Sequence, residues 1–190
     1  MIENLNSIQE DRFMKRTIFV AILSCTLIVA ASSLFAAAYD HEVTANKVTF
    51  SWKIDGDVMH AKMSAKTKGW VAVGFNPSEK MKGANFILGF VKNGKAEVTD
   101  HYGTSAVNHA VDTKNGGSED VTLVGGSEEK GITTIEFTMP INSSDQNDSV
   151  LSADGDTVVL LAYAMRDSFK ARHKGNPGMI TVNLATGAVK

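Results

Sequence analysis

Cysteine is nearly absent from this chain of 190 residues, and the single cysteine, Cys25, lies in an apolar segment near the N-terminus. The rest of the chain therefore forms no disulfide and holds no thiolate-bound metal. It also lacks a cysteine nucleophile and the Cys-x-x-Cys-His motif of covalent cofactor attachment. A domain without such cross-links is stabilised by its core, and 43% hydrophobic residues are enough for one domain of this length.

Motifs for hydrolytic or nucleotide chemistry are also missing. The chain contains no Gly-x-Ser-x-Gly, P-loop or Gly-x-Gly-x-x-Gly, and its five histidines form neither His-x-His nor His-Glu-x-x-His. Most carboxylates fall in turns, where we expect them to be solvated. The net charge of −2 indicates neither a nucleic-acid surface nor a polybasic membrane patch, so we expect no nucleic-acid partner.

Residues 1–38 have the composition of an export signal. A basic start at Met14-Lys15-Arg16 precedes an apolar run over residues 17–35 and three alanines at 36–38. We expect translation to begin at Met14, the signal peptide to be removed, and residues 39–190 to form a single periplasmic or extracellular domain. If the segment stays uncleaved, residues 17–38 anchor the protein in a membrane and provide its only membrane contact.

The exported part shows no sustained helical period, and its pattern is that of short strands. We expect strands at residues 48–52, 58–63, 70–75, 86–91, 96–102, 121–124, 132–139, 158–164 and 179–184. Asp55-Gly56-Asp57 and Asn93-Gly94 predict hairpin turns. Three long polar loops are expected, at residues 103–119, 142–152 and 167–177. This pattern predicts an all-β fold, an antiparallel two-sheet β-sandwich of immunoglobulin-like architecture.

The segment at residues 69–90, GWVAVGFNPSEKMKGANFILGF, organises the chain. Both faces of its first strand are apolar, so we expect that strand to be buried on both sides. The following loop is polar except for Met81. Either this thioether is simply exposed or something apolar covers it.

These residues carry a resemblance to a known family. Together with DHYGT, TTIEFTMPI, DTVVLLAYA and DSFKARHKGNPGMITVNL, the segment resembles the haem-binding branch of the DOMON domain, from about residue 41 to residue 184. The fold this implies is similar to that of the cytochrome domain of cellobiose dehydrogenase. The resemblance implies a b-type haem bound without covalent bonds, with Met81 and His173 at the positions of the two axial ligands of the iron.

The resemblance leaves several site residues open. Some relatives resemble haem subunits in which lysine replaces the histidine, so Lys170 and Lys174 remain alternatives to His173. Further candidates for contact with the haem are Trp70, Phe75 and Phe169, and the cations Arg172 and Lys174 are candidates to pair with its propionates. For the aromatic residues, ordinary core packing is an equally good explanation, and a solvated basic loop explains the cations.

Axial ligation by methionine and histidine implies an electron carrier, because it leaves no open position for oxygen or substrate. We therefore predict a one-electron transfer module, not an enzyme, that exchanges electrons with a periplasmic or membrane-bound redox partner. The alternative is a carbohydrate-binding DOMON sandwich without haem, in which Trp52, Trp70, Tyr102 and acidic turns form the cleft. Two tryptophans offer little stacking surface for a sugar, which disfavours that alternative.

Overall fold

The computed structural model describes residues 39–152 and 154–190, almost entirely as antiparallel strands and their connections. The predicted signal peptide, the start at Met14 and the possible anchor all lie outside the described residues. No helix within the described ranges is long and apolar enough to cross a bilayer.

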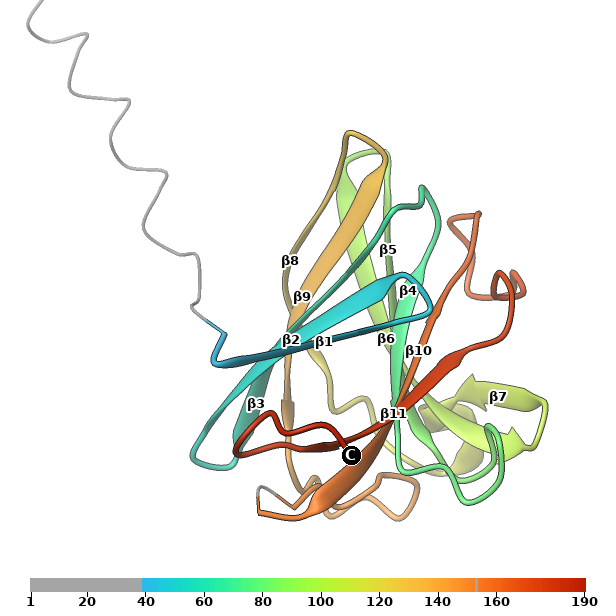
Figure 1. The fold of residues 1–190 in the computed structure, drawn as a ribbon. Helices are drawn as coiled ribbons and strands as arrows, with labels where there is room; N and C mark the ends of the chain where they lie inside the picture. The colour runs from blue at the N-terminus through green and yellow to red at the C-terminus, as the bar shows by residue number, and fades with distance from the viewer. Residues whose placement is uncertain (1–38, 153) are drawn as a thin grey trace, which may run out of the picture. The chain divides into compact units, whose positions relative to one another are not determined.

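The strands form two sheets that pack face to face (Figure 1). The five-stranded sheet has the order β1 (His41–Ala45), β2 (Val48–Asp55), β3 (Val58–Ala65), β9 (Ile132–Pro140) and β8 (Thr122–Glu129). The six-stranded sheet has the order β11 (Gly178–Asn183), β10 (Asp156–Tyr163), β4 (Val71–Phe75), β5 (Asn85–Lys92), β6 (Lys95–Ser105) and β7 (Asn108–Val111). The predicted antiparallel two-sheet sandwich is confirmed.

The main hydrophobic core lies between the two sheets. Side chains of β3 alternate between this core and the other face of the sheet. Met59, Ala61 and Met63 are fully buried in the core, while the intervening His60 and Lys62 are half-buried. Phe50 and Trp52 of β2 stack in the same core with ring centroids 5.2 Å apart. Burial of each large apolar side chain contributes about 1.5–3 kcal/mol, so this core accounts for much of the stability of a domain without disulfides.

Both predicted hairpins are confirmed. Strand β5 pairs with β6 up to Lys92 and Lys95, so Asn93 and Gly94 form a two-residue turn. Both turn residues have positive φ, 52° and 76°, as the type I′ turn of an Asn-Gly hairpin requires. Strand β2 likewise pairs with β3 through a turn at Gly56, whose φ is 58°.

The prediction of a loop over residues 103–119 is wrong in part. Strand β6 continues to Ser105, β7 pairs back along it, and a 3₁₀ turn, η1 (Asp112–Asn115), follows. The register shifts between Tyr102 and Ser105, and this bulge interrupts the alternation by which a strand is recognised in sequence. Strand β1 was not predicted either, because its five residues are mostly polar.

Candidate functional site

The six-stranded sheet is apolar on both faces. Strand β4 turns Val71, Val73 and Phe75 toward the core between the sheets, while Ala72 faces the opposite way. The outer face is formed by one cluster of buried residues: Trp70, Ala72, Ala84, Phe86, Leu88, Phe90, Leu160 and Ala164. An apolar sheet face of this kind requires a cover, and two loops provide it.

Gly74 is the reason that Phe86 can lie flat on this face. The two residues are cross-strand partners in β4 and β5, and a Cβ at Gly74 would lie 2.3 Å from the Phe86 ring. The missing side chain therefore lets the aromatic ring cover the backbone of the neighbouring strand.

The first loop brings Met81 to this face. Met81 is half-buried and packs against the outer cluster, so of the two alternatives left open by the sequence, partial cover by an apolar surface applies to its thioether. The loop is held by main-chain hydrogen bonds, from Gly83 to the carbonyl of Gly103 at 2.8 Å and from Ala84 to the carbonyl of Met81 at 3.2 Å. A Cβ at Gly103 would lie within 2 Å of the Met81 carbonyl oxygen, so β6 approaches the loop this closely only because residue 103 is glycine.

The second loop joins β10 to β11 and carries His173. Phe169 and Ala171 of this loop pack against the outer cluster, and the Phe169 ring lies 4.6 Å from the Phe90 ring, centroid to centroid. The main-chain N–H of Lys174 donates to the carbonyl of Tyr163 at 2.7 Å. Both expected ligand loops therefore border one apolar face, and Phe169 closes that face.

The hydrogen bond of His173 fixes the state of its ring. Nδ1 lies 2.7 Å from the carbonyl oxygen of Gly175, and because a carbonyl only accepts, Nδ1 carries the proton. In the neutral ring the lone pair is then on Nε2. A histidine that binds a metal through one nitrogen commonly donates the other N–H to a backbone carbonyl in this way.

A pair of histidines that was not singled out from the sequence, His101 and His109, lies at the same face. His101 and His109 are joined through their Nδ1 atoms at 2.8 Å, and the His109 ring lies 5.5 Å from the ring of Phe86. Burial lowers the pKa of both imidazoles, that of His101 to about 4. For His109, electrostatic repulsion between its protonated ring and a protonated His173 is a second, smaller cause of the lowered pKa.

The structure does not bring all the expected site residues together. Phe75 faces the core between the sheets, where its ring contacts Phe50 with centroids 5.9 Å apart, so the core interpretation applies to it. Trp70 lies on the outer face, and Phe169 covers that face. Arg172 and Lys174 are exposed beside His173, as is Lys170, the other candidate ligand.

The two tryptophans expected to line a sugar-binding cleft are likewise separated. Trp52 is fully buried between the sheets and its Nε1 donates to the carbonyl of Leu184, whereas Trp70 is 3% exposed on the outer face of the other sheet. Neither indole is available to stack on a sugar.

Comparisons with known proteins agree with this architecture. The model of the DOMON domain family matches residues 44–164. The human DBH-like monooxygenase protein 1 is 27% identical over 141 residues, which are 73% of this chain and 22% of that protein. The human putative DBH-like monooxygenase protein 2 is 30% identical over 132 residues, 66% of this chain and 25% of that protein. The chain thus spans about a quarter of the length of these relatives.

Two solved structures share the fold. The cytochrome domain of Myriococcum thermophilum cellobiose dehydrogenase superposes with a TM-score of 0.56 at 14% identity, covering 78% of this chain and 83% of that one. The cytochrome b domain of pyranose dehydrogenase from Coprinopsis cinerea gives a TM-score of 0.53 at 12% identity, covering 74% and 78%. With the family model matching well over half of its residues, the chain belongs to the DOMON family.

Proposed function

We propose that this protein is an exported one-electron transfer module that binds a b-type haem through Met81 and His173. The observation that carries the proposal is the hydrogen bond from His173 Nδ1 to the Gly175 carbonyl, which orients the imidazole and leaves Nε2 as the ligand atom. The proposal is supported by the cytochrome domains that share the fold.

The residues of the outer face fit such a group. A porphyrin is a large apolar plane, and the outer cluster offers an apolar surface bordered by a soft thioether on one loop and an imidazole on another. Phe169 covers this surface in the structure. We infer that the connection between β10 and β11 moves outward to admit the ligand, and that Phe169 then packs on its edge.

A bound haem would supply a single-electron couple, and Met81 and His173 would hold it as ligands and leave no position on the iron for a substrate. The protein's own contribution is to exclude water with the apolar sheet face and to hold the two ligand atoms. The proposal therefore assigns no catalytic residue, and the monooxygenase named among the relatives is mostly made of sequence that this chain does not span.

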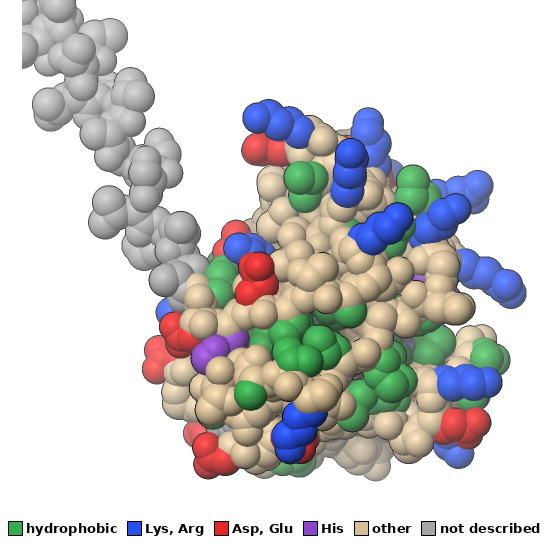
Figure 2. Space-filling view, viewed as in Figure 1, with side chains coloured by type: hydrophobic (Ala, Val, Ile, Leu, Met, Phe, Trp, Pro, Cys, Tyr) green, Lys and Arg blue, Asp and Glu red, His purple; other side chains and the backbone are tan. Residues whose placement is uncertain are grey.

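The loop that carries His173 also supplies positive charge. Its exposed cations are Arg166, Lys170, Arg172 and Lys174. Figure 2 shows Lys and Arg side chains gathered at the upper right of the molecule, where Figure 1 draws the connection between β10 and β11. We propose that Arg172 and Lys174 bind the propionates, and that the rest of the patch steers an acidic surface of a redox partner.

The test is the visible spectrum of the purified protein after haem reconstitution. We expect the spectrum of a low-spin six-coordinate b-haem on reduction, and its loss in both Met81→Ala and His173→Ala. Met179→Ala and His60→Ala are matched controls, since Met179 is 59% exposed on an edge strand and His60 lies on the other sheet. A low-spin spectrum that survives in His173→Ala but disappears in Lys170→Ala or Lys174→Ala would identify lysine as the ligand. A protein that binds no haem would overturn the proposal.

A further inference from the structure

An acidic cluster closes one end of the core between the sheets, on the side of β5 and β6 opposite to the apolar outer face. Asn85 and Ile87 alternate with Phe86 along β5, so both face inward. Asp100 of β6 is the cross-strand partner of Ile87 and faces the same way. Asp100 lies in the strand predicted at residues 96–102 and is 1% exposed, unlike the carboxylates that fall in turns.

Four oxygen atoms in this cluster are buried without a hydrogen-bond partner. They are Oδ1 of Asn85, both carboxylate oxygens of Asp100 and Oδ2 of Asp112, and each of these three residues is 1% exposed. A buried acceptor without a partner costs roughly 1–3 kcal/mol, and more when it is charged. Four such oxygen atoms in one cluster indicate that they bind a ligand.

Two loops complete the cluster and orient its side chains. Asp148 accepts hydrogen bonds from Asn85 Nδ2 at 2.6 Å and from the Ser143 hydroxyl at 2.7 Å. Asn147 Nδ2 donates to Asp112 Oδ1 at 2.7 Å. These bonds fix Nδ2 of the Asn85 amide and Oδ1 of the Asp112 carboxylate. The remaining oxygen of each group, Asn85 Oδ1 and Asp112 Oδ2, has no partner.

No side-chain cation among the described residues neutralises this charge. Within residues 39–152 and 154–190, no lysine or arginine nitrogen lies within 4.0 Å of Asp100, Asp112 or Asp148. Burial is the main cause that raises the pKa of Asp100 to about 9, and the negative charges of Asp148 and Asp112 contribute to this shift. The pKa of Asp148 is raised to about 6, also chiefly by burial. These acids repel one another in the absence of a bound cation.

We propose that Asn85, Asp100 and Asp112 form a Ca²⁺ site that ties β5 and β6 to the two loops. All the free donors are oxygens, which are the ligands of Ca²⁺, whereas zinc and copper sites use the imidazoles and thiolates that this cluster lacks. No three His, Cys, Asp or Glu side chains among the described residues are close enough to hold an ion by themselves. The proposed ligand set therefore includes the Asn85 amide oxygen, and main-chain or water oxygens would have to supply the remainder of the six to eight that Ca²⁺ takes.

The test is thermal unfolding of the chelator-treated chain at pH 7.5, with and without Ca²⁺. At a Ca²⁺ concentration 100 times the Kd, we expect Tm to rise by about 5–10 °C, and Mg²⁺ to have a much smaller effect. Asp100→Asn and Asp112→Asn should each abolish the rise. Asp100→Asn should also be at least as stable as the wild type without Ca²⁺, because the amide is neutral in both states, whereas the buried Asp100 carboxyl must take up a proton on folding.

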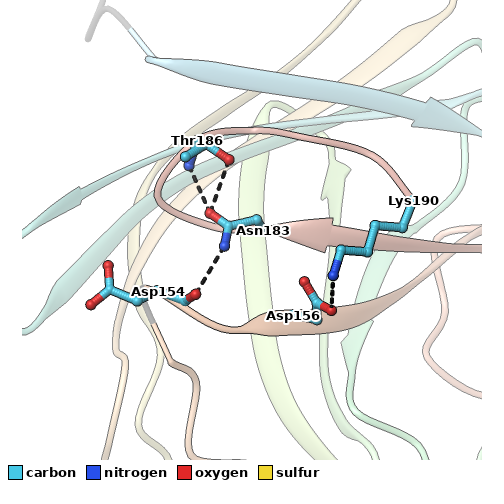
Figure 3. Close-up of polar contacts among 5 residues, drawn as sticks. All are labelled: Asp154, Asp156, Asn183, Thr186 and Lys190. Atoms are coloured by element: carbon cyan, nitrogen blue, oxygen red, sulfur yellow. Dashed lines mark hydrogen bonds and ion pairs between the residues drawn. The ribbon is translucent and has the colours of Figure 1, made fainter.

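The control variant is Asp156→Asn, which should keep the full Ca²⁺ response. Asp156 is 44% exposed and pairs with Lys190 beside the Asn183 turn (Figure 3), outside the acidic cluster. A wild-type Tm that does not change in about 10 mM Ca²⁺, above the weakest range of extracellular sites, would overturn the proposal. A rise that persists in Asp100→Asn would overturn it too. The haem spectrum of the same samples reports on the outer face separately, so the two proposals fail independently.

Discussion

The indole Nε1 of Trp70 donates a hydrogen bond of 3.1 Å to the main-chain carbonyl of Ala171. Trp70 directly precedes β4 in the middle of the six-stranded sheet, and Ala171 lies two residues before His173. A buried side chain thus ties the connection between β10 and β11 to the rigid part of the fold.

Replacement of Trp70 by phenylalanine keeps an aromatic ring on the outer face and removes this bond. We expect the free energy of unfolding to fall by about 1–2 kcal/mol, and amide hydrogen exchange in residues 165–177 to accelerate. Trp52→Phe is the matched control. Trp52 Nε1 also donates to a main-chain carbonyl, that of Leu184, but it lies in the core between the two sheets. Equal exchange rates in the 165–177 loop of the two variants would contradict the role assigned to Trp70.

Phe169 closes the outer face, so its truncation should expose that face. We expect Phe169→Ala to increase the binding of a hydrophobic fluorescent dye and to lower the free energy of unfolding by about 1–3 kcal/mol, less than a fully buried phenylalanine because Phe169 is half-buried. Phe169→Leu should retain most of the cover. A dye response that is no larger in the alanine variant than in the leucine variant would show that another group covers the face.

Gly103 controls the position of Met81. Gly103→Ala would place a Cβ against the carbonyl of Met81 and force the loop away from β6. We expect a loss of stability of about 1–3 kcal/mol and, in the haem-reconstituted protein, a weaker low-spin spectrum. Gly125→Ala is the control, since a Cβ at Gly125 meets nothing within 4 Å. Equal effects of the two substitutions on the spectrum would argue against Met81 as a ligand.

His101 should make the stability depend on acidity. Its pKa is about 4 in the folded protein, lowered mainly by burial and also by His109 and Lys114, against about 6.5 in an unfolded chain. The neutral ring is favoured in the fold, so its contribution is complete above pH 6.5 and is lost as the pH falls toward 4.

The corresponding variant is His101→Phe, which cannot take up this proton. The difference in unfolding free energy between wild type and variant should change by about 3 kcal/mol between pH 7 and pH 4, to the disadvantage of the wild type. Denaturant titrations at several pH values measure this difference. If the two proteins lose stability in parallel, His101 is not the titrating group.

Local signals account for the part of the fold that could be predicted. The Asn93-Gly94 turn and the alternation of β3 specify a hairpin and a buried face by themselves. Strand β7 was not predicted, because its four residues, two polar and two apolar, lie beside a bulge and show neither alternation nor a turn motif. The two faces of β4 were correctly separated by alternation, but only the structure shows that Trp70 belongs to the outer face and Phe75 to the core between the sheets.

The parts of the sites that sequence missed depend on long-range pairing. His101 and His109 meet because β7 folds back on β6 within a stretch interpreted as a loop. Asp100 and Asp148 lie on a strand and on a distant loop, and nothing local distinguishes either from a solvated carboxylate. The resemblance to haem-binding DOMON domains supplied Met81 and His173, which remain predictions until the spectra are measured.

Strands β5 and β6 serve both proposed sites with adjacent residues, since Asn85 and Asp100 face inward while Phe86 and His101 face outward. A one-residue slip of this hairpin would therefore bury acids among aromatic rings and set aromatic rings among acids. Each of these two changes would destabilise the fold, and both would occur together because one slip in register moves every side chain of the strand to the opposite face. Insertion or deletion of a single residue in β5 or β6 should therefore lower the stability of the protein far more than the same change in one of its turns.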